Sequence, residues 1–266
     1  MSVRSDDHDG GVRVLTLDRP PANAIDESLM RDLAAAVDTA RDDDAVRAVV
    51  LTGAGTFFSG GFDFAAPRRD DTVATDLYER YRAAHLKLLT LPKPTLAMVN
   101  GHAIAGGLVL ALACDHRLCA AADYRVGLNE VAVGASFPRA AFEIVQLRLP
   151  HTAVCELMLG AALYPVTTAP RLGIADELVP RDALLSTALR RAGRLGAYPR
   201  EAYAHAKAAL VAPAVARIEA ETATEGLATM AVWITPESRA ARSRQRQALG
   251  MNQGATSDAV PAKLRP

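Results

Sequence analysis

Three short apolar runs, each followed after a loop by helix-like sequence, constrain the fold of this chain more than any other feature. The runs are VRVLTL (residues 12–17), AVRAVVLTG (45–53) and PTLAMVNG (94–101), and the last two end at glycine. Strands that are apolar along their whole length are covered on both faces, which is typical of parallel sheets in β/α proteins. The pattern therefore predicts an α/β fold with a mostly parallel sheet.

Helical periodicity follows the first run. Asp26 can serve as an N-cap, and the apolar residues after it predict one helix that ends near Arg41. The apolar positions of this predicted helix are Leu29, Met30, Leu33, Ala36, Val37 and Ala40. Further short strands are predicted at 116–121 and 124–127.

The last third of the chain reads as helical, because the strand signal fades after about residue 150. Alanine-rich amphipathic segments predict helices at 152–160, 182–196, 200–211, 214–232 and 237–249. We assign residues 1–196 to a core domain, 197–250 to a C-terminal helical region and 251–266 to a flexible tail. The tail is polar, contains glycine and proline, and has no periodicity.

Charge and cysteine content exclude several classes of protein. The 30 lysines and arginines balance 30 aspartates and glutamates, so nothing favours nucleic acid or anionic membranes as partners. The acidic, polar start is unlike a secretory signal, and no window approaches the ~18 apolar residues of a membrane span, so we expect a cytoplasmic protein. Cys114, Cys119 and Cys155 lie in apolar stretches without metal-ligand spacing, which predicts reduced core thiols.

Two glycine-bearing loops are the main candidates for a site: GAGTFFSGGFDF (53–64) and NGHAIAGGLVLALACD (100–115). Small residues let a ligand approach the backbone amides, and Gly106 and Gly107 open an apolar run that predicts a helix N-terminus. Neither loop has the spacing of a phosphate or dinucleotide loop, and no serine-hydrolase elbow occurs. Glycine pairs also serve close packing of helix on sheet, so this signal alone leaves both interpretations open.

Five ordered stretches make the chain resemble the enoyl-CoA hydratase/isomerase, or crotonase, superfamily. They are RPPANAID (19–26), RAVVLTGAGTFFSGGFDF (47–64), LPKPTLAMVNGHAIAGGLVLALACDHRLCAA (91–121), YRVGLNEVAVG (124–134) and APRLGIADELVP (169–180). The resemblance implies a crotonase-like core, a superhelix of ββα turns with two roughly perpendicular sheets. It also implies C-terminal oligomerisation helices that build homotrimers or dimers of trimers.

The resemblance also implies an acyl-CoA thioester as substrate, with the amides of Phe62 and Gly106 holding the thioester oxygen. No metal or separate cofactor is implied, because coenzyme A is part of the substrate. The ring of Phe62 is larger than the alanine or glycine often found at this position, and it either narrows the acyl pocket or packs inward. The other implied substrate-binding positions are Ala22, Ala24, Gly60, Asp63, Phe64, Arg68, Gly107 and Asn129.

Glu130 is the one acid/base residue that the resemblance places well. Hydratases of the family carry a second glutamate where this chain has Val109, so the pattern favours moving a double bond from the 3- to the 2-position of an enoyl-CoA. Hydration or other crotonase chemistry, and acyl-CoA binding without turnover, remain the alternatives. For Glu130 itself the alternative is an exposed or ion-paired carboxylate.

The remaining polar residues near the motifs have more ordinary interpretations. We expect Asp63 to stabilise its loop by accepting backbone amides, and His102 to be a loop or core residue. Arg19, Arg68, Arg69 and Lys93 are candidates for the coenzyme A phosphates, Arg68 foremost, with a solvated charge as the alternative for each. The amphipathic stretch Val215–Trp233 is either a subunit contact or an intramolecular helix.

Overall fold

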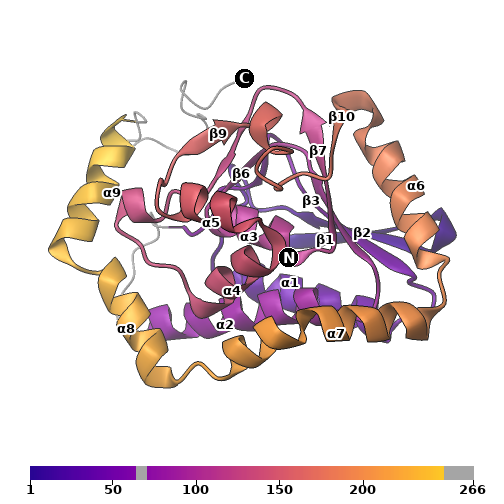
Figure 1. The fold of residues 1–266 in the computed structure, drawn as a ribbon, viewed down its shortest axis with the longest axis horizontal. Coiled ribbons are helices and arrows are strands. Elements are labelled where there is room, and N and C mark those ends of the chain that lie inside the picture. Colours follow the sequence, from indigo (N-terminus) through magenta and orange to yellow (C-terminus); the bar gives the residue numbers. More distant parts are fainter. Residues whose placement is uncertain (64–70, 249–266) are drawn as a thin grey trace.

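A computed structural model describes residues 1–63 and 71–248 and shows two sheets surrounded by helices (Figure 1). The larger sheet, in this part of the chain, has the strand order β1-β2-β3-β5-β7-β10. Its strands are β1 (Val3–His8), β2 (Val12–Leu17), β3 (Ala48–Gly53), β5 (Thr95–Val99), β7 (His116–Ala121) and β10 (Glu177–Pro180). All neighbours pair in parallel except β1, which is antiparallel to β2. The predicted mostly parallel sheet is confirmed.

The smaller sheet has the order β4-β6-β8-β9 among the described residues. It contains β4 (Phe57–Ser59), β6 (His102–Ile104), β8 (Arg125–Gly127) and β9 (Leu163–Pro165). The chain passes from β3 to β4, from β5 to β6 and from β7 to β8 before it enters a helix. These repeated strand-strand-helix units agree with the expected crotonase-like core.

Five strands were missed by the periodicity: β1, β4, β6, β9 and β10, of which β4 and β6 are three residues each and lie in the segments predicted as glycine loops. β1 has the polar sequence VRSDDH and pairs on one side only, so its middle is exposed rather than apolar. β9 and β10 are three and four residues long, too short for a periodic signal. The expectation that strands end near residue 150 is therefore wrong, because β10 extends the large sheet beside β7.

The helices follow the predicted pattern more closely. Asp26 caps the first helix by accepting a hydrogen bond from the amide of Leu29 at 2.8 Å, as expected. The described helices are α1 (Glu27–Asp42), α2 (Asp71–Thr90), α3 (Gly106–Ala113), α4 (Arg139–Arg148), α5 (His151–Met158), α6 (Leu184–Gly196), α7 (Arg200–Glu219), α8 (Ala223–Trp233) and α9 (Pro236–Ala248). Short 3₁₀ turns lie at Asp9–Gly11, Val131–Val133, Val166–Thr168 and Arg181–Ala183.

The predicted break between 211 and 214 is wrong, because α7 continues through Pro213. Packing outweighs the cost of the proline, since Val211, Ala214 and Ile218 are buried and α7 contacts α2 and α4. The helix ends at Glu219, and a Thr222–Glu225 capping box begins α8. The tail predicted at 251–266 lies outside the described residues.

Core positions agree with the apolar runs, with one exception among the cysteines. Every residue of α3 is buried, as expected for a helix that is apolar all round. Cys114 and Cys119 are buried, but Cys155 is exposed. The prediction of a core thiol is wrong for Cys155, which lies on an outward face of α5.

Candidate active site

The loop after β2 and the loop after β4 are joined by backbone hydrogen bonds. The amide of Ile25 donates to the carbonyl oxygen of Gly61 at 2.7 Å, and the amide of Asp63 donates to the carbonyl oxygen of Ile25 at 2.9 Å. Buried Asn23, with φ of 49°, donates from its side chain to the carbonyl oxygen of Phe57 at 2.9 Å. Asparagine tolerates this left-handed backbone conformation, so it can hold the turn closed.

The predicted positions Ala22, Ala24 and Gly60 lie in these joined loops. The amide of Gly60 donates to the carbonyl oxygen of Ala22 at 2.8 Å. The carbonyl oxygen of Ala24 accepts a hydrogen bond from the guanidinium of Arg19 at 3.2 Å. The structure therefore brings these three predicted residues together beside the first glycine loop.

The two glycine loops touch directly, which places Phe62 next to Gly106. Gly61 has φ of 79°, and a Cβ there would lie 2.9 Å from the carbonyl oxygen of Ile104. A Cβ on Gly107 would lie 2.2 Å from the carbonyl oxygen of Ser59. Glycine is thus required at both positions by close backbone packing. Gly106 begins α3, where the first-turn amides have no acceptors within the helix.

The ring of Phe62 packs inward. It stacks on Tyr81 with ring centroids 4.9 Å apart and an angle of 27°, and it meets Trp233 edge-on at 4.9 Å. A Cβ on Gly106 would lie 3.8 Å from Cδ2 of Phe62. The phenyl ring is therefore a wall beside the amide of Gly106, with an aromatic neighbour on each side.

Glu130 follows β8, and the end of β8 contacts the second glycine loop. The carbonyl oxygen of Gly127, where β8 ends, accepts from the amide of Ala105 at 2.8 Å, so the chain after β8 starts beside the second glycine loop. Glu130 is only 6% exposed, and its Oε2 has no hydrogen-bond partner among the described residues. Burial raises the pKa of its carboxyl to about 8. An exposed carboxylate is thereby excluded, and no ion pair to Glu130 forms within residues 1–63 and 71–248.

Two further positions named by the resemblance, Asn129 and Val109, are both buried. Asn129 is buried, and its carbonyl oxygen accepts from the amide of Val133 at 3.2 Å within the 3₁₀ turn that follows. Val109 is fully buried in α3 and adds no polar atom. Among the described residues, Glu130 is thus the buried carboxyl group that follows the motif strand β8.

Tyr81 of α2 was not predicted, although it is fully buried at the centre of this cluster. A Cβ on Gly106 would lie 3.4 Å from its Cε2 atom. Burial, and then the charge of Glu130, raise the pKa of Tyr81 well above its usual value. In sequence, an aromatic residue at helical spacing is indistinguishable from an ordinary core residue, so no signal marked it.

The basic candidates for coenzyme A phosphates are placed less favourably than expected. Arg19 forms ion pairs with Asp26 at 2.8 Å and Asp63 at 2.7 Å, so its charge is already paired within the protein. His102 is a buried residue of β6, as expected, and accepts from the amide of Arg125 at 3.1 Å. Phe64, Arg68 and Arg69 lie outside the described residues.

Lys93 is the clearest departure from expectation. It lies just before β5, at the amino-terminal edge of the parallel strands, whereas the glycine loops follow the carboxyl ends of β3 and β5. Its ammonium donates to the carbonyl oxygens of Ala40 at 2.7 Å and Asp43 at 2.8 Å. Lys93 therefore closes the end of α1 and does not belong to this site.

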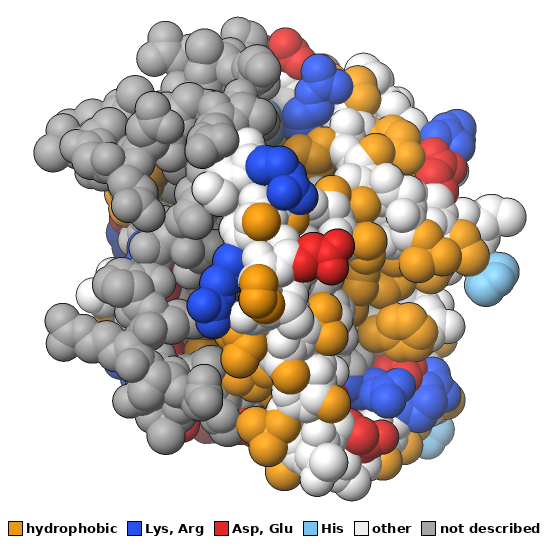
Figure 2. All heavy atoms as spheres, turned by 90° about the vertical axis from the view of Figure 1, so that its left-hand side faces the viewer, with side chains coloured by type: hydrophobic (Ala, Val, Ile, Leu, Met, Phe, Trp, Pro, Cys, Tyr) orange, Lys and Arg blue, Asp and Glu red, His pale blue; other side chains and the backbone are white. Residues whose placement is uncertain are grey.

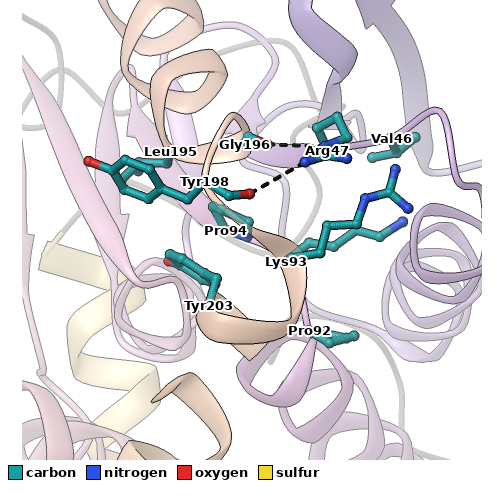
Figure 3. Close-up of a pocket in the computed structure, with 10 residues that line it drawn as sticks. Val46, Arg47, Pro92, Lys93, Pro94, Leu195, Gly196, Tyr198 and Tyr203 are labelled. Atoms are coloured by element: carbon teal, nitrogen blue, oxygen red, sulfur yellow. Dashed lines mark hydrogen bonds between the residues drawn. The ribbon is translucent and has the colours of Figure 1, made fainter. Parts of the chain in front are cut away.

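A pocket beside Lys93 is shown in Figure 3. Arg47 and Lys93 face it together with Tyr198 and Tyr203. The guanidinium of Arg47 donates to the carbonyl oxygens of Gly196 at 3.0 Å and Tyr198 at 3.4 Å, so its charge is already used within the protein. We assign no function to this pocket, which lies at the opposite edge of the large sheet from Glu130.

The paired glycine loops, the helix N-terminus at Gly106 and the buried carboxyl of Glu130 define a crotonase-type fold and site. A family profile described as enoyl-CoA hydratase/isomerase matches residues 7–242. The chain belongs to the enoyl-CoA hydratase/isomerase family.

Some relatives of this chain are named hydratases and others are named isomerases. A probable enoyl-CoA hydratase of Mycolicibacterium paratuberculosis is 31% identical over 224 residues, 82% of this chain and 87% of that protein. A protein of Mycobacterium tuberculosis, named an enoyl-CoA isomerase with one structure and a probable enoyl-CoA hydratase with another, is 33% identical; the first structure has a TM-score of 0.77 over 86% of this chain and 97% of that one. Human mitochondrial delta3-delta2-enoyl-CoA isomerase has a TM-score of 0.89 over 96% of this chain and 100% of that one, at 23% identity, which shows the shared fold.

The described residues contain neither a helix that could span a membrane nor a cluster of side chains that could hold a metal ion. No helix there combines the length and the apolar character that crossing a bilayer requires. No three histidine, cysteine, aspartate or glutamate side chains in residues 1–63 and 71–248 come together as ligands of one metal ion.

Proposed function

We propose that this protein binds an acyl-CoA thioester and shifts the double bond of a 3-enoyl-CoA to the 2-position, with Glu130 as the proton shuttle. The observation that carries the proposal is the buried carboxyl of Glu130, whose Oε2 has no hydrogen-bond partner among the described residues and which follows the strand that contacts the second glycine loop. The family and the relative named an enoyl-CoA isomerase support this class of reaction.

The proposed reaction needs one carboxylate and two backbone donors. The carboxylate of Glu130 takes a proton from C2, and the electrons of that C–H bond move into a dienolate whose negative charge lies largely on the thioester oxygen. The amides of Phe62 and Gly106 donate to that oxygen; one such donor is typically worth ~3 kcal/mol in the transition state. Glu130 then returns the proton at C4, which leaves the double bond between C2 and C3.

A pKa of about 8 suits this role, because the group gives and takes a proton near neutral pH. We further propose that the loop positions Ala22, Ala24, Gly60 and Gly107 line the path of the thioester, with Asn129 beside the base. The proposal involves no resident cofactor, since coenzyme A belongs to the substrate. Addition of a metal chelator is expected to leave the rate unchanged.

Hydration is the second candidate, because the relative at 31% identity is named a probable enoyl-CoA hydratase. The position that resembles the family's other glutamate is Val109, a buried side chain without a polar atom. Water addition to a 2-enoyl-CoA at a rate above double-bond migration would favour hydration over our proposal. Binding of acyl-CoA with no product of either kind would favour a protein without turnover.

The direct test compares Glu130→Gln with the wild type in a spectrophotometric assay that follows the conjugated double bond formed from 3-enoyl-CoA. Loss of the base is expected to lower kcat by ~10² to 10⁴-fold, the usual contribution of general acid-base catalysis. Glu156→Gln, at an exposed position of α5 where Glu156 pairs with Arg171, is the matched control and should retain full activity. Equal rates for wild type and Glu130→Gln would contradict the proposal.

We also propose that the protein forms homotrimers, alone or in pairs, through its C-terminal helices. Leu227 and Val232 of α8 and the adjacent Ile234 are 54%, 45% and 43% exposed. Figure 2 views the molecule from the side on which α8 and α9 lie and shows hydrophobic side chains spread over that face among charged ones. Light scattering after gel filtration should give a trimer or hexamer mass, and Leu227→Glu should lower it; a concentration-independent monomer would contradict the proposal.

A further inference from the structure

Tyr81 and Glu130 present two of the polar atoms that the fold buries without satisfying them; Nε2 of His85, beside Tyr81, is another. The hydroxyl of Tyr81 and Oε2 of Glu130 are both inaccessible to water, and neither has a hydrogen-bond partner within the described residues. Most buried polar atoms in proteins are paired, because an unpaired one costs ~1–3 kcal/mol. Two such atoms in one cluster point to a function that offsets this cost.

The ring of Tyr81 is held so that its hydroxyl cannot turn away to find a partner. One face stacks on Phe62, and the ring of His85 lies with its centroid 3.8 Å from that of Tyr81. Nδ1 of His85 lies 2.8 Å from the carbonyl oxygen of Tyr81, which indicates that this nitrogen carries the proton. This hydrogen bond fixes the imidazole ring of His85, which in turn packs against the ring of Tyr81.

The hydroxyl lies on the substrate side of α2. The Cε2 atom of Tyr81, next to the carbon that bears the hydroxyl, is 3.4 Å from the Cβ position on Gly106. Gly106 is the residue whose amide we propose to hold the thioester oxygen. Both groups are buried, and the charge of Glu130 contributes to the raised pKa of the phenol. The phenol therefore stays neutral and keeps its proton as a donor.

A phenol donor and a carboxyl acceptor are complementary to a hydroxyl group, which accepts one hydrogen bond and donates another. A hydrocarbon acyl chain in the same place leaves both groups unpaired. Sites that contain buried partners for a substrate hydroxyl discriminate strongly against analogues that lack it.

We propose that Tyr81 determines specificity: its hydroxyl and Oε2 of Glu130 together bind a hydroxyl group on the acyl chain and select hydroxyacyl over hydrocarbon thioesters. This inference rests on the proposed function only in placing an acyl-CoA thioester beside Gly106.

The test measures affinity rather than turnover. Butyryl-CoA and its 2-, 3- and 4-hydroxy derivatives are titrated by calorimetry into wild type and Tyr81→Phe. At least one hydroxybutyryl-CoA should bind the wild type ~10-fold or more tightly than butyryl-CoA, and the variant should lose that preference. The same preference in both proteins, or none in the wild type, would overturn the inference.

Tyr78→Phe is the matched control, because Tyr78 lies one turn earlier on α2 and its hydroxyl donates to Glu221 at 2.6 Å. It should keep the wild-type preference while melting at a lower temperature. Tyr81→Phe removes an unpaired hydroxyl and should melt at the wild-type temperature or higher, which would show that its loss of preference does not come from unfolding.

The outcomes separate the two proposals. Binding of all four thioesters without a preference, together with isomerisation that depends on Glu130, overturns the role of Tyr81 alone. A preference lost in Tyr81→Phe, together with isomerisation unaffected by Glu130→Gln, overturns the proposed function alone. Binding of none of the thioesters overturns both.

Discussion

Glu130 is an ionisable group in a place where ionisation is costly. Its carboxyl is buried, its Oε2 has no hydrogen-bond partner among the described residues, and burial raises its pKa to about 8 from a usual value of 4.5. A difference in pKa between folded and unfolded chains makes stability depend on pH. The raised pKa of Glu130, which suits a proton shuttle, therefore also lowers the stability of the fold above pH 4.5. Both the catalytic effect and the stability effect can be measured.

Glu130→Gln is expected to be more stable than the wild type at pH 8 and to lose that advantage as the pH falls to 4.5. Below pH 4.5 the carboxyl is protonated in both states; between 4.5 and about 8 only the unfolded chain releases the proton, so wild-type stability falls as the pH rises. The slope has an upper limit of ~1.4 kcal/mol per pH unit. Urea unfolding from pH 4.5 to 8.5 measures the gap, and a gap independent of pH would contradict the shifted pKa.

The pH dependence of activity gives a second prediction at this residue. The base must be deprotonated to act, so kcat/KM for isomerisation should rise with pH and level off near the pKa of about 8 of the free enzyme. A stopped-flow or steady-state profile between pH 6 and 9 is the measurement. A flat profile over this range would show that another group accepts the proton.

At the scale of elements, α7 is anchored to the large sheet by a buried ionic cluster. Nζ of Lys207 donates to Oδ2 of Asp115 at 2.9 Å, and Arg148 and Tyr203 contact the same carboxylate at 3.3 Å and 3.0 Å. Burial tends to raise the pKa of Asp115, but its cationic neighbours and hydrogen bonds outweigh burial and lower it. The cluster joins the turn before β7 to a helix about 90 residues further along the chain.

Lys207→Met is expected to lower the free energy of unfolding by about 3 kcal/mol, because the buried carboxylate of Asp115 loses one of its cationic partners. Arg171→Met removes an equally short ion pair, 2.8 Å from Glu156, but an exposed one, and should cost less than ~1 kcal/mol. Urea denaturation of both variants measures the difference. Equal losses would show that burial does not set the strength of these pairs.

At the scale of the whole molecule, the C-terminal helices take part in building the site. Trp233, at the end of α8, is buried against Val133 and Ala135 of the loop that follows Glu130, and its ring meets Phe62. α9 covers the same loop, where a Cβ on Gly134 would lie 2.5 Å from Cα of Ser238. Ile218, Met230 and Trp233 are thus used within the chain, whereas Leu227 is exposed. The stretch 215–233 thus packs one face within the chain and leaves Leu227 exposed for the proposed subunit contact.

Trp233→Ala should destabilise the protein by ~3–5 kcal/mol and raise KM for acyl-CoA, because Phe62 loses its edge contact. Trp233→Phe keeps an aromatic ring but loses the hydrogen bond from Nε1 to the carbonyl oxygen of Ser136 at 2.9 Å, at a cost of about 1 kcal/mol. Thermal melts and substrate titrations measure both effects. An unchanged KM in a folded Trp233→Ala protein would show that α8 does not shape the site.

The sequence by itself determined the parallel sheet, the capped first helix, the family and the two glycine loops. These features are local: β-branched runs, helical spacing, a capping aspartate and glycines depend on neighbours a few residues away. The sequence also singled out Glu130, although only the fold showed its burial and its lack of a partner among the described residues.

Only the tertiary structure decided which distant residues meet. Lys93 is near the motifs in sequence, yet it lies at the far edge of the sheet because β5 runs away from it toward the glycine loops. Tyr81 is distant from Glu130 in sequence, yet both groups are buried and the charge of Glu130 contributes to the raised pKa of the phenol. A residue's burial and its neighbours are decided when separate segments pack together. No local sequence pattern could therefore predict that Tyr81 and Glu130 are both buried in this part of the fold.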